Sequence, residues 1–247
     1  MLPTFLIIGA QKCGTTSLHE YLAEHPQVGR PSTKEIQYFT HNSYRPPAWY
    51  RAHFPRAGEF AHTFESTPYT LFHPACPGRV RALLPDVKLI VLLRDPVDRA
   101  LSHYNHQVAG SFEALDFQTA LAREGERLQG EEQRLRDDPR YRSFAYQHYS
   151  YVARGMYARQ LGRWYALYDA EQLLVLRSED LFADPPGTLH RIQAWLGLGE
   201  HTPSTLTARG ARRYPPMDPG TRAQLRARFE QDAAELRALT GVELSRA

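Results

Sequence analysis

Residues 9–16 have the residue types and the spacing of a loop that binds an anion. They read Gly-Ala-Gln-Lys-Cys-Gly-Thr-Thr, after an apolar run at residues 5–8 and before an amphipathic segment that starts near Thr16. A strand, a glycine loop and a helix N-terminus together bind phosphate, because unpaired N–H groups converge on the anion and the helix dipole favours it. The candidate binding residues are Gln11, Lys12, Cys13, Gly14, Thr15 and Thr16.

The position of the lysine separates this loop from the P-loop that binds nucleoside triphosphates. That motif reads G-x-x-x-x-G-K-[ST], with the lysine directly after the second glycine. Gly9 and Gly14 have the same spacing here, but Thr15 occupies the lysine position and Lys12 lies inside the loop. The pattern therefore indicates an anion other than a magnesium-bound triphosphate.

A second candidate for anion binding follows the continuous apolar run at residues 88–93. Arg94 comes directly after this run, and Ser102 lies two turns into the helix predicted next. A guanidinium and a hydroxyl at that corner could hold a second phosphate near the first loop. The alternative is that Arg94 pairs with Asp95 or Asp98 at the start of the helix.

Two further segments carry charge and leave their interpretation open. Lys34 and Glu35 lie in the loop region after the first predicted helix, where a carboxylate could act as general base if its position and pKa suit. An exposed ion pair without a chemical role is the alternative. Residues 208–216 are basic and contain glycine, and they either fold over an anionic ligand or form a surface loop.

No group of residues has the spacing of a metal site. His103 and His106 lie one turn apart on a predicted helix, but the sequence offers no third ligand beside them. We expect no metal, and we expect both histidines either to face the site or to be ordinary helix residues. His106 is a candidate substrate-binding residue.

Composition excludes several classes of protein. The 247 residues carry a formal net charge of only +3, which does not favour nucleic acid or an acidic membrane as a partner. Cys13 and Cys76 do not form a disulfide framework, and no apolar run reaches the roughly 18 residues of a membrane span. Without a charged and apolar leader, the expected location is cytoplasmic.

The elements that must position these residues alternate between strand and helix over a single domain, residues 1–247. Strands are predicted at residues 5–8, 62–65, 88–93 and 173–176. Helices are predicted at residues 16–23, 96–108, 113–136, 156–168, 186–196 and 219–239, and residues 80–84 are predicted to end a further helix. Residues 29–55 lack clear periodicity and are predicted as loops around a site. The fold class is therefore α/β, with a P-loop-like domain whose central parallel sheet is flanked by helices and binds ligands at the carboxyl ends of its strands.

Taken together, these segments resemble the sulfotransferases that use 3′-phosphoadenosine 5′-phosphosulfate (PAPS), in the branch of bacterial and heparan sulfate-modifying members. In this family the first loop holds the 5′-phosphosulfate, which implies that role for residues 11–16, with Lys12 at the family's lysine position. An Arg-x₇-Ser element holds the 3′-phosphate, and Arg94 and Ser102 match it. The element that carries the catalytic base is matched by Lys34, Glu35, Tyr38 and Phe39.

The sequence departs from the family pattern at two places. The basic loop that closes over the donor usually reads Lys-Gly-Arg-x-His-Pro, and here Arg212 is matched while Tyr214 stands in the histidine position. Residues 65–69 resemble a substrate-side element, which implies a substrate contact for Glu65. Ser66 replaces a lysine that is frequent in heparan-modifying members, which argues against a highly sulfated acceptor.

The resemblance implies transfer of a sulfuryl group from PAPS to a hydroxyl or amine of a glycan or small-molecule acceptor. Glu35 would take the proton of the acceptor, and Lys12 would stabilise the charge that develops on the leaving phosphate as adenosine 3′,5′-bisphosphate forms, with no metal required. One alternative is a P-loop kinase that phosphorylates a small hydroxyl substrate with Mg-ATP. Another is a nucleotide-binding protein without catalysis. The sequence indicates neither the acceptor nor the oligomeric state.

Overall fold

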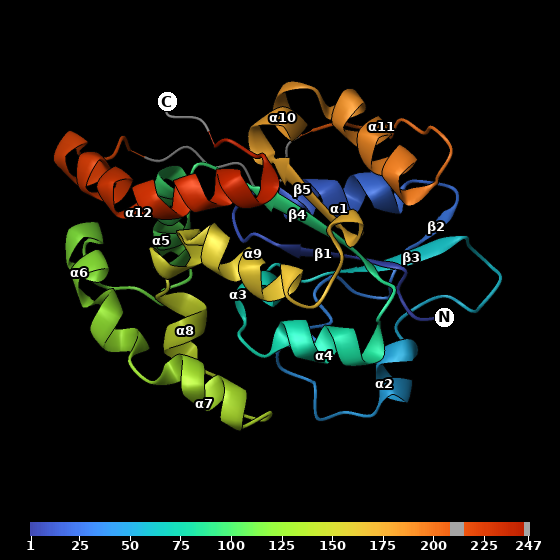
Figure 1. Ribbon diagram of the computed structural model, residues 1–247, viewed down its shortest axis with the longest axis horizontal. Helices are drawn as coiled ribbons and strands as arrows, with labels where there is room; N and C mark the ends of the chain where they lie inside the picture. Colours follow the sequence, from blue (N-terminus) through green and yellow to red (C-terminus); the bar gives the residue numbers. More distant parts are fainter. Residues whose placement is uncertain (208–214, 245–247) are drawn as a thin grey trace.

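A sheet of five parallel strands forms the centre of the computed structural model, which describes residues 1–207 and 215–244 (Figure 1). The strands are β1 (Phe5–Gly9), β2 (Val28–Gly29), β3 (His62–Ser66), β4 (Lys88–Leu93) and β5 (Leu173–Arg177), in the order β2-β3-β1-β4-β5. Every neighbouring pair is parallel. The predicted α/β fold with a central parallel sheet is thereby confirmed. β2 was not predicted, because two residues are too few to show a periodicity.

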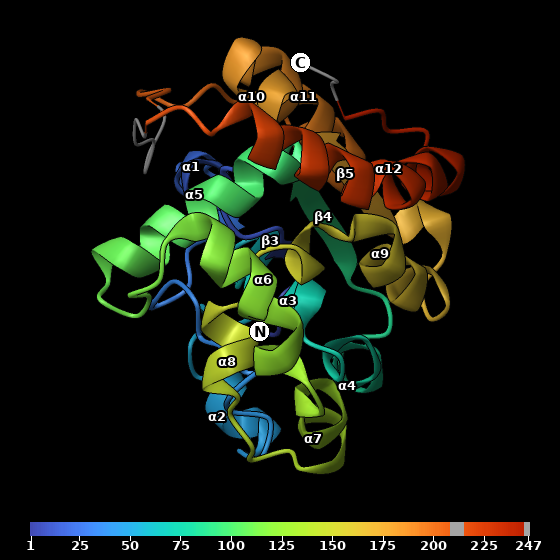
Figure 2. The ribbon, with the colours of Figure 1, turned by 90° about the vertical axis from the view of Figure 1, so that its left-hand side faces the viewer.

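Helices surround this sheet. They are α1 (Thr15–Ala23), α2 (Pro47–Arg51), α3 (Tyr69–Phe72), α4 (Cys76–Leu83), α5 (Pro96–Ala109), α6 (Phe117–Leu128), α7 (Glu131–Asp137), α8 (Phe144–His148), α9 (Tyr157–Tyr165), α10 (Ser178–Ala183), α11 (Pro185–Leu196) and α12 (Pro219–Thr240). In Figure 1, α10 and α11 lie above the sheet and α4 lies below it, while α5 to α8 lie on the left, beyond the carboxyl ends of the strands. Figure 2 looks at that end and shows α5, α6 and α8 in front of β3 and β4.

Local sequence explains where the central elements begin and end. The apolar run of β4 is completely buried from Leu89 to Leu93, as expected for a strand covered on both faces. Asp95 then caps α5, since its carboxylate accepts hydrogen bonds from the N–H groups of Val97 and Asp98, both at 2.9 Å. The predicted cap and start of this helix are confirmed.

Two predictions of secondary structure were wrong in detail. The single helix predicted over residues 113–136 is divided into α6 and α7, because Gly130 has a φ of 75° and begins the second helix. The segment predicted as loops at residues 29–55 contains the short helix α2. Among the described helices, none is long and apolar enough to cross a membrane.

Candidate active site

A cavity of about 830 Å³ lies at the carboxyl ends of β1, β3, β4 and β5. The predicted site residues in its wall are Gln11, Lys12, Gly14, Thr15, Thr16, Lys34, Glu35, Arg94, Ser102 and His106. The structure thus brings together three segments that are far apart in the sequence. Its position agrees with the rule that ligands bind where the strands of an open parallel sheet end.

The loop between β1 and α1 has the backbone of an anion cradle. Lys12 and Gly14 have φ angles of 71° and 87°, and Gly14 is the N-cap of α1. Successive N–H groups in a turn that leads into a helix form a concave, positively polarised surface. Cys13 contributes no side chain to the cavity, since its thiol is fully buried and lies 3.8 Å from the Tyr157 hydroxyl. Burial raises the pKa of this thiol to about 11, so it stays protonated at neutral pH.

Gln11 is oriented by a buried arginine. Arg154 is only 3% exposed, and its Nη1 donates a hydrogen bond to Gln11 Oε1 at 2.9 Å. It also contacts the rings of Tyr69 and Phe72. Desolvation lowers the pKa of Arg154 to about 10, which still leaves it charged at neutral pH. Because a guanidinium can only donate, the Gln11 oxygen must face it, which leaves the Gln11 amide NH₂ as the donor on the other side.

The second corner of the cavity carries a cation from β4 and a hydroxyl from α5. Arg94 follows β4 directly and lines the cavity with Ser102. Asp95 caps α5, and Asp98 forms an ion pair with Arg222 of α12 at 2.8 Å. The two carboxylates that were the alternative partners of Arg94 are therefore engaged in other contacts, which favours a role for Arg94 in ligand binding.

Glu35 lies at the same cavity on a loop with unusual backbone geometry. Glu35 and Gln37 have φ angles of 57° and 56°, in the left-handed region that such residues seldom adopt. Lys34 Nζ donates to Thr16 Oγ1 at 2.8 Å and lies 3.3 Å from Glu35 Oε1. Lys34 therefore joins the candidate base to the first turn of the anion cradle.

Glu65, predicted on the substrate side, is an interior residue that supports this loop. It is 3% exposed, and its carboxylate accepts hydrogen bonds from the Tyr50 hydroxyl, from Thr67 Oγ1 at 2.7 Å and from the Gln37 N–H at 3.0 Å. Burial raises the pKa of Glu65, and these hydrogen bonds oppose the shift. The buried carboxylate holds the left-handed segment that carries Glu35, and it does not line the cavity.

Tyr38 and Phe39 are also interior residues. The Tyr38 ring stacks on Tyr50 with centroids 4.3 Å apart, its hydroxyl donates to the Arg45 carbonyl at 3.1 Å, and Phe39 is 2% exposed. Neither side chain lines the cavity, and both belong to the main hydrophobic core.

The remaining predictions concern His106, Arg212 and metals. His106 is exposed and lines the cavity, whereas His103 is completely buried, which keeps its pKa well below the usual range. Within residues 1–207 and 215–244, no cluster of side chains could hold a metal ion. Arg212 lies outside the described residues.

One wall of the cavity was not predicted. It consists of Pro68, Asp98, Ser178, Glu179, Phe182, Ala183, Pro185 and Leu206. Among the apolar members, Phe182 packs so closely on Gly14 of the anion cradle that a Cβ there would lie 2.9 Å from the ring. An apolar surface beside a phosphate cradle suits the face of a planar ring. The position of Ser178 directly after β5 was the available signal, because residues that follow a parallel strand face this edge.

Comparison with known proteins agrees with this geometry. A family model described as "Sulfotransferase domain" matches residues 2–208. The mouse heparan sulfate glucosamine 3-O-sulfotransferase 3A1 is 35% identical over 202 residues, which cover 80% of this chain and 46% of that protein. The human bifunctional heparan sulfate N-deacetylase/N-sulfotransferase 3 is 29% identical over an alignment of 272 residues, gaps included, which covers 95% of this chain and 29% of that protein. The matched regions thus span about half or less of these curated relatives.

Solved structures show the same architecture. A sulfotransferase from Alicyclobacillus acidocaldarius superposes with a TM-score of 0.82 at 31% identity, covering 99% of this chain and 98% of the other. The sulfotransferase domain of the Synechococcus PCC 7002 olefin synthase has a TM-score of 0.53 at 16% identity, covering 98% of this chain and 96% of the other, which is a similarity of fold alone.

Proposed function

The chain belongs to the sulfotransferase family, and from this premise we propose that it transfers a sulfuryl group from PAPS to a hydroxyl or amine of a glycan or small-molecule acceptor. One observation carries the proposal. A single cavity of about 830 Å³ contains the glycine cradle, the Arg94–Ser102 corner and the Glu35 carboxylate. Two anion sites and a candidate base in one cavity match a donor with two separate phosphate groups.

In this proposal each of the two anion sites binds a different phosphate group of the donor. The cradle at residues 11–16 suits the 5′-phosphosulfate, because its N–H groups and the N-terminus of α1 favour negative charge. Arg94 and Ser102 suit the 3′-phosphate, which distinguishes this donor from ATP. The apolar wall at Phe182 and Leu206 suits the adenine ring.

In this proposal Glu35 is the general base. In the proposed step, the acceptor oxygen or nitrogen attacks sulfur while Glu35 takes its proton, and the bond from sulfur to the 5′-phosphate oxygen breaks. The products are the sulfated acceptor and adenosine 3′,5′-bisphosphate. Lys12 in the cradle stabilises the negative charge that develops on the leaving oxygen. As in phosphoryl transfer, positioning and charge stabilisation supply most of the catalysis.

Thermal unfolding in the presence of three ligands tests this proposal. A ligand that binds only the folded state must raise the melting temperature. We expect a large increase with adenosine 3′,5′-bisphosphate and a small one with AMP, since AMP lacks the 3′-phosphate. An increase with Mg-ATP alone would refute the sulfotransferase proposal and favour the P-loop kinase.

A further inference from the structure

We infer that an exposed aromatic cluster beyond the end of α5 binds a sugar ring of a glycan acceptor, next to the unit that enters the cavity. The cluster consists of Phe112, Phe144 and His148 and is called the aromatic ledge below. The inference rests on the proposed function and specifies the acceptor class, a glycan chain longer than one unit.

The ledge continues one face of α5 that already lines the cavity. Asp98, Ser102 and His106 follow each other at intervals of four residues and all line the cavity. Residues at this spacing share one face of a helix. The next position on the face is Gly110, about 6 Å beyond His106 at the usual rise per residue. The Phe112 ring lies directly on it, since a Cβ at Gly110 would be 2.8 Å from Cδ2 of Phe112.

The two phenylalanine rings of the ledge are unusually exposed for their size, whereas His148 is partly buried. Phe112 and Phe144 are 45% and 50% exposed. Their centroids are 5.9 Å apart, and the His148 ring lies 4.4 Å from the first and 4.3 Å from the second. Contiguous exposed apolar surface of this kind marks binding sites more often than isolated exposed residues do.

The backbone of Phe112 is fixed in spite of this exposure. Its N–H donates to the Gln107 carbonyl at 2.9 Å, and its carbonyl accepts from the Tyr149 hydroxyl at 3.0 Å. The preceding residue, Ser111, has a φ of 59°, a conformation that costs free energy and persists only where the surroundings enforce it. The backbone that carries the exposed ring is thus held in place at an energetic cost.

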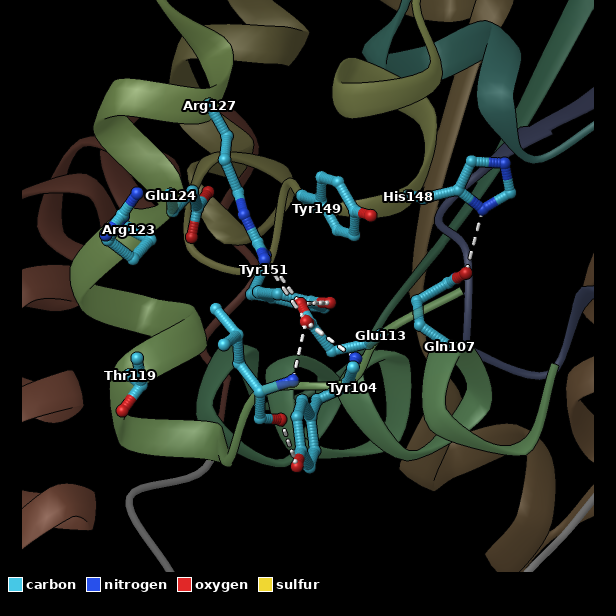
Figure 3. Close-up of polar contacts among 12 residues, drawn as sticks. Tyr104, Gln107, Glu113, Thr119, Arg123, Glu124, Arg127, His148, Tyr149 and Tyr151 are labelled. Atoms are coloured by element: carbon cyan, nitrogen blue, oxygen red, sulfur yellow. Dashed lines mark hydrogen bonds and ion pairs between the residues drawn. The ribbon is translucent and has the colours of Figure 1, made fainter. Parts of the chain in front are cut away.

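A buried carboxylate anchors the same loop on its other side. Glu113 is 5% exposed and is held by the Arg127 guanidinium, by the Tyr151 hydroxyl at 2.8 Å and by the N–H groups of Ala114 and Leu115, both at 3.0 Å (Figure 3). This network leaves the loop little freedom. A preorganised apolar surface binds with less loss of conformational entropy than a mobile one.

The His148 ring is held by a separate contact. Figure 3 shows its Nδ1 beside the Gln107 side chain, with the Nδ1–Oε1 distance 2.8 Å. This contact orients the imidazole, which lies against both phenylalanine rings. The ledge therefore combines two fixed apolar rings with a polar ring that can form hydrogen bonds.

The shape and chemistry of the ledge favour a glycan over a small aryl acceptor. A small ligand normally buries most of its surface in a pocket, which the cavity of about 830 Å³ offers and the open ledge does not. An acceptor that uses both must extend from the cavity over the surface. A sugar unit presents an apolar C–H face to the rings of Phe112 and Phe144, and its hydroxyl edge can bind to polar groups such as His148.

Binding of a defined oligosaccharide tests this inference without a transfer assay. The probe is an unsulfated hexasaccharide of alternating glucosamine and glucuronic acid, titrated by calorimetry against protein saturated with adenosine 3′,5′-bisphosphate. We expect Phe112→Ala combined with Phe144→Ala to weaken hexasaccharide binding by about tenfold, the scale of losing two aromatic contacts. The affinities for the corresponding disaccharide and for the bisphosphate should not change.

Phe60→Ala is the matched control, because Phe60 is also an exposed phenylalanine, at 37%, and lies in the chain between α2 and β3. It should bind the hexasaccharide as the wild type does. Equal hexasaccharide affinity in the wild type and the double variant would overturn the inference, as would bisphosphate binding without any hexasaccharide binding, which leaves the donor site intact. Failure to bind the bisphosphate would refute the proposed function, and the inference would fall with it.

Discussion

The substitution Gly14→Ala tests whether the cradle between β1 and α1 binds the donor. Gly14 has a φ of 87°, and an alanine in this left-handed conformation costs about 1–2 kcal/mol of stability. The new Cβ would also lie 2.9 Å from Cζ of Phe182. Phe182 is 41% exposed, so its ring can rotate away from the contact without much loss of stability. We expect the rotation to move the ring out of the cavity wall and the backbone strain at residue 14 to shift the N–H groups of the cradle.

Gly58→Ala is the control, since Gly58 has a φ of 90° and a Cβ there would meet nothing within 4 Å. In urea unfolding, both variants should lose a similar free energy of about 1–2 kcal/mol, because both bear the same backbone strain. In calorimetric titration with adenosine 3′,5′-bisphosphate, only Gly14→Ala should lose affinity. The loss should be roughly tenfold or more, since a hydrogen bond to a charged group contributes about 1.5–3 kcal/mol.

A double-mutant cycle with Phe182→Ala separates the two causes. If the ring has already left the wall in Gly14→Ala, removing Phe182 from that variant should cost no further affinity, whereas removing it from the wild type should. Bisphosphate affinity at the wild-type level in Gly14→Ala would show that the cradle does not hold the donor. A loss of stability several kcal/mol greater than in Gly58→Ala would show that the Phe182 ring cannot move.

Three further predictions concern the site and the pH dependence of folding. Glu35→Gln should abolish transfer of labelled sulfate from PAPS while bisphosphate affinity stays near wild type, and transfer at the wild-type rate would exclude Glu35 as the base. Arg94→Ala should weaken the bisphosphate by about 1.5–3 kcal/mol and AMP hardly at all, as measured by calorimetry, whereas equal weakening would remove Arg94 from the 3′-phosphate site. Burial raises the pKa of Glu124 from 4.5 to about 7, so its favourable contribution to stability is complete below about pH 4.5 and is lost as the pH rises through about 7. Between pH 4.5 and 8, urea unfolding should therefore show the wild type losing about 3 kcal/mol relative to Glu124→Gln, and a constant difference would contradict the shifted pKa.

The parts of the site that lie next to strand ends could be predicted from the sequence. Residues 11–16 and Arg94 each follow a recognisable apolar strand, and the carboxyl ends of parallel strands meet at one edge of the sheet. Local motif and general topology therefore sufficed to place them together. The only part of the strand order that matters for these two segments is that β1 lies beside β4.

The parts that depend on tertiary packing could not be predicted. Glu65 was assigned to the substrate side because nothing in the sequence indicates that its carboxylate turns inward to the Gln37 N–H, 28 residues away. The part of the cavity wall formed by Phe182 depends on the packing of α10 against Gly14, which is 168 positions away in the sequence. The break at Gly130 could not be predicted because an isolated glycine within a helical pattern is tolerated, as Gly125 is inside α6.

Asp98, Glu179 and Glu35 line the cavity in which we propose that a donor with several negative charges binds. Asp98 is paired with Arg222 of α12, and Glu179 Oε1 accepts the Asp95 N–H at 3.2 Å, while the buried Oε2 of Glu179 has no hydrogen-bond partner among the described residues. Glu35, the proposed base, lies beside Lys34. Asp98 and Glu35 thus each lie beside a cation, while Lys12 and Arg94 are the cations at the two proposed anion sites. We expect these cations to reduce the repulsion between the proposed base and a donor with several negative charges, which the proposed sulfuryl transfer requires.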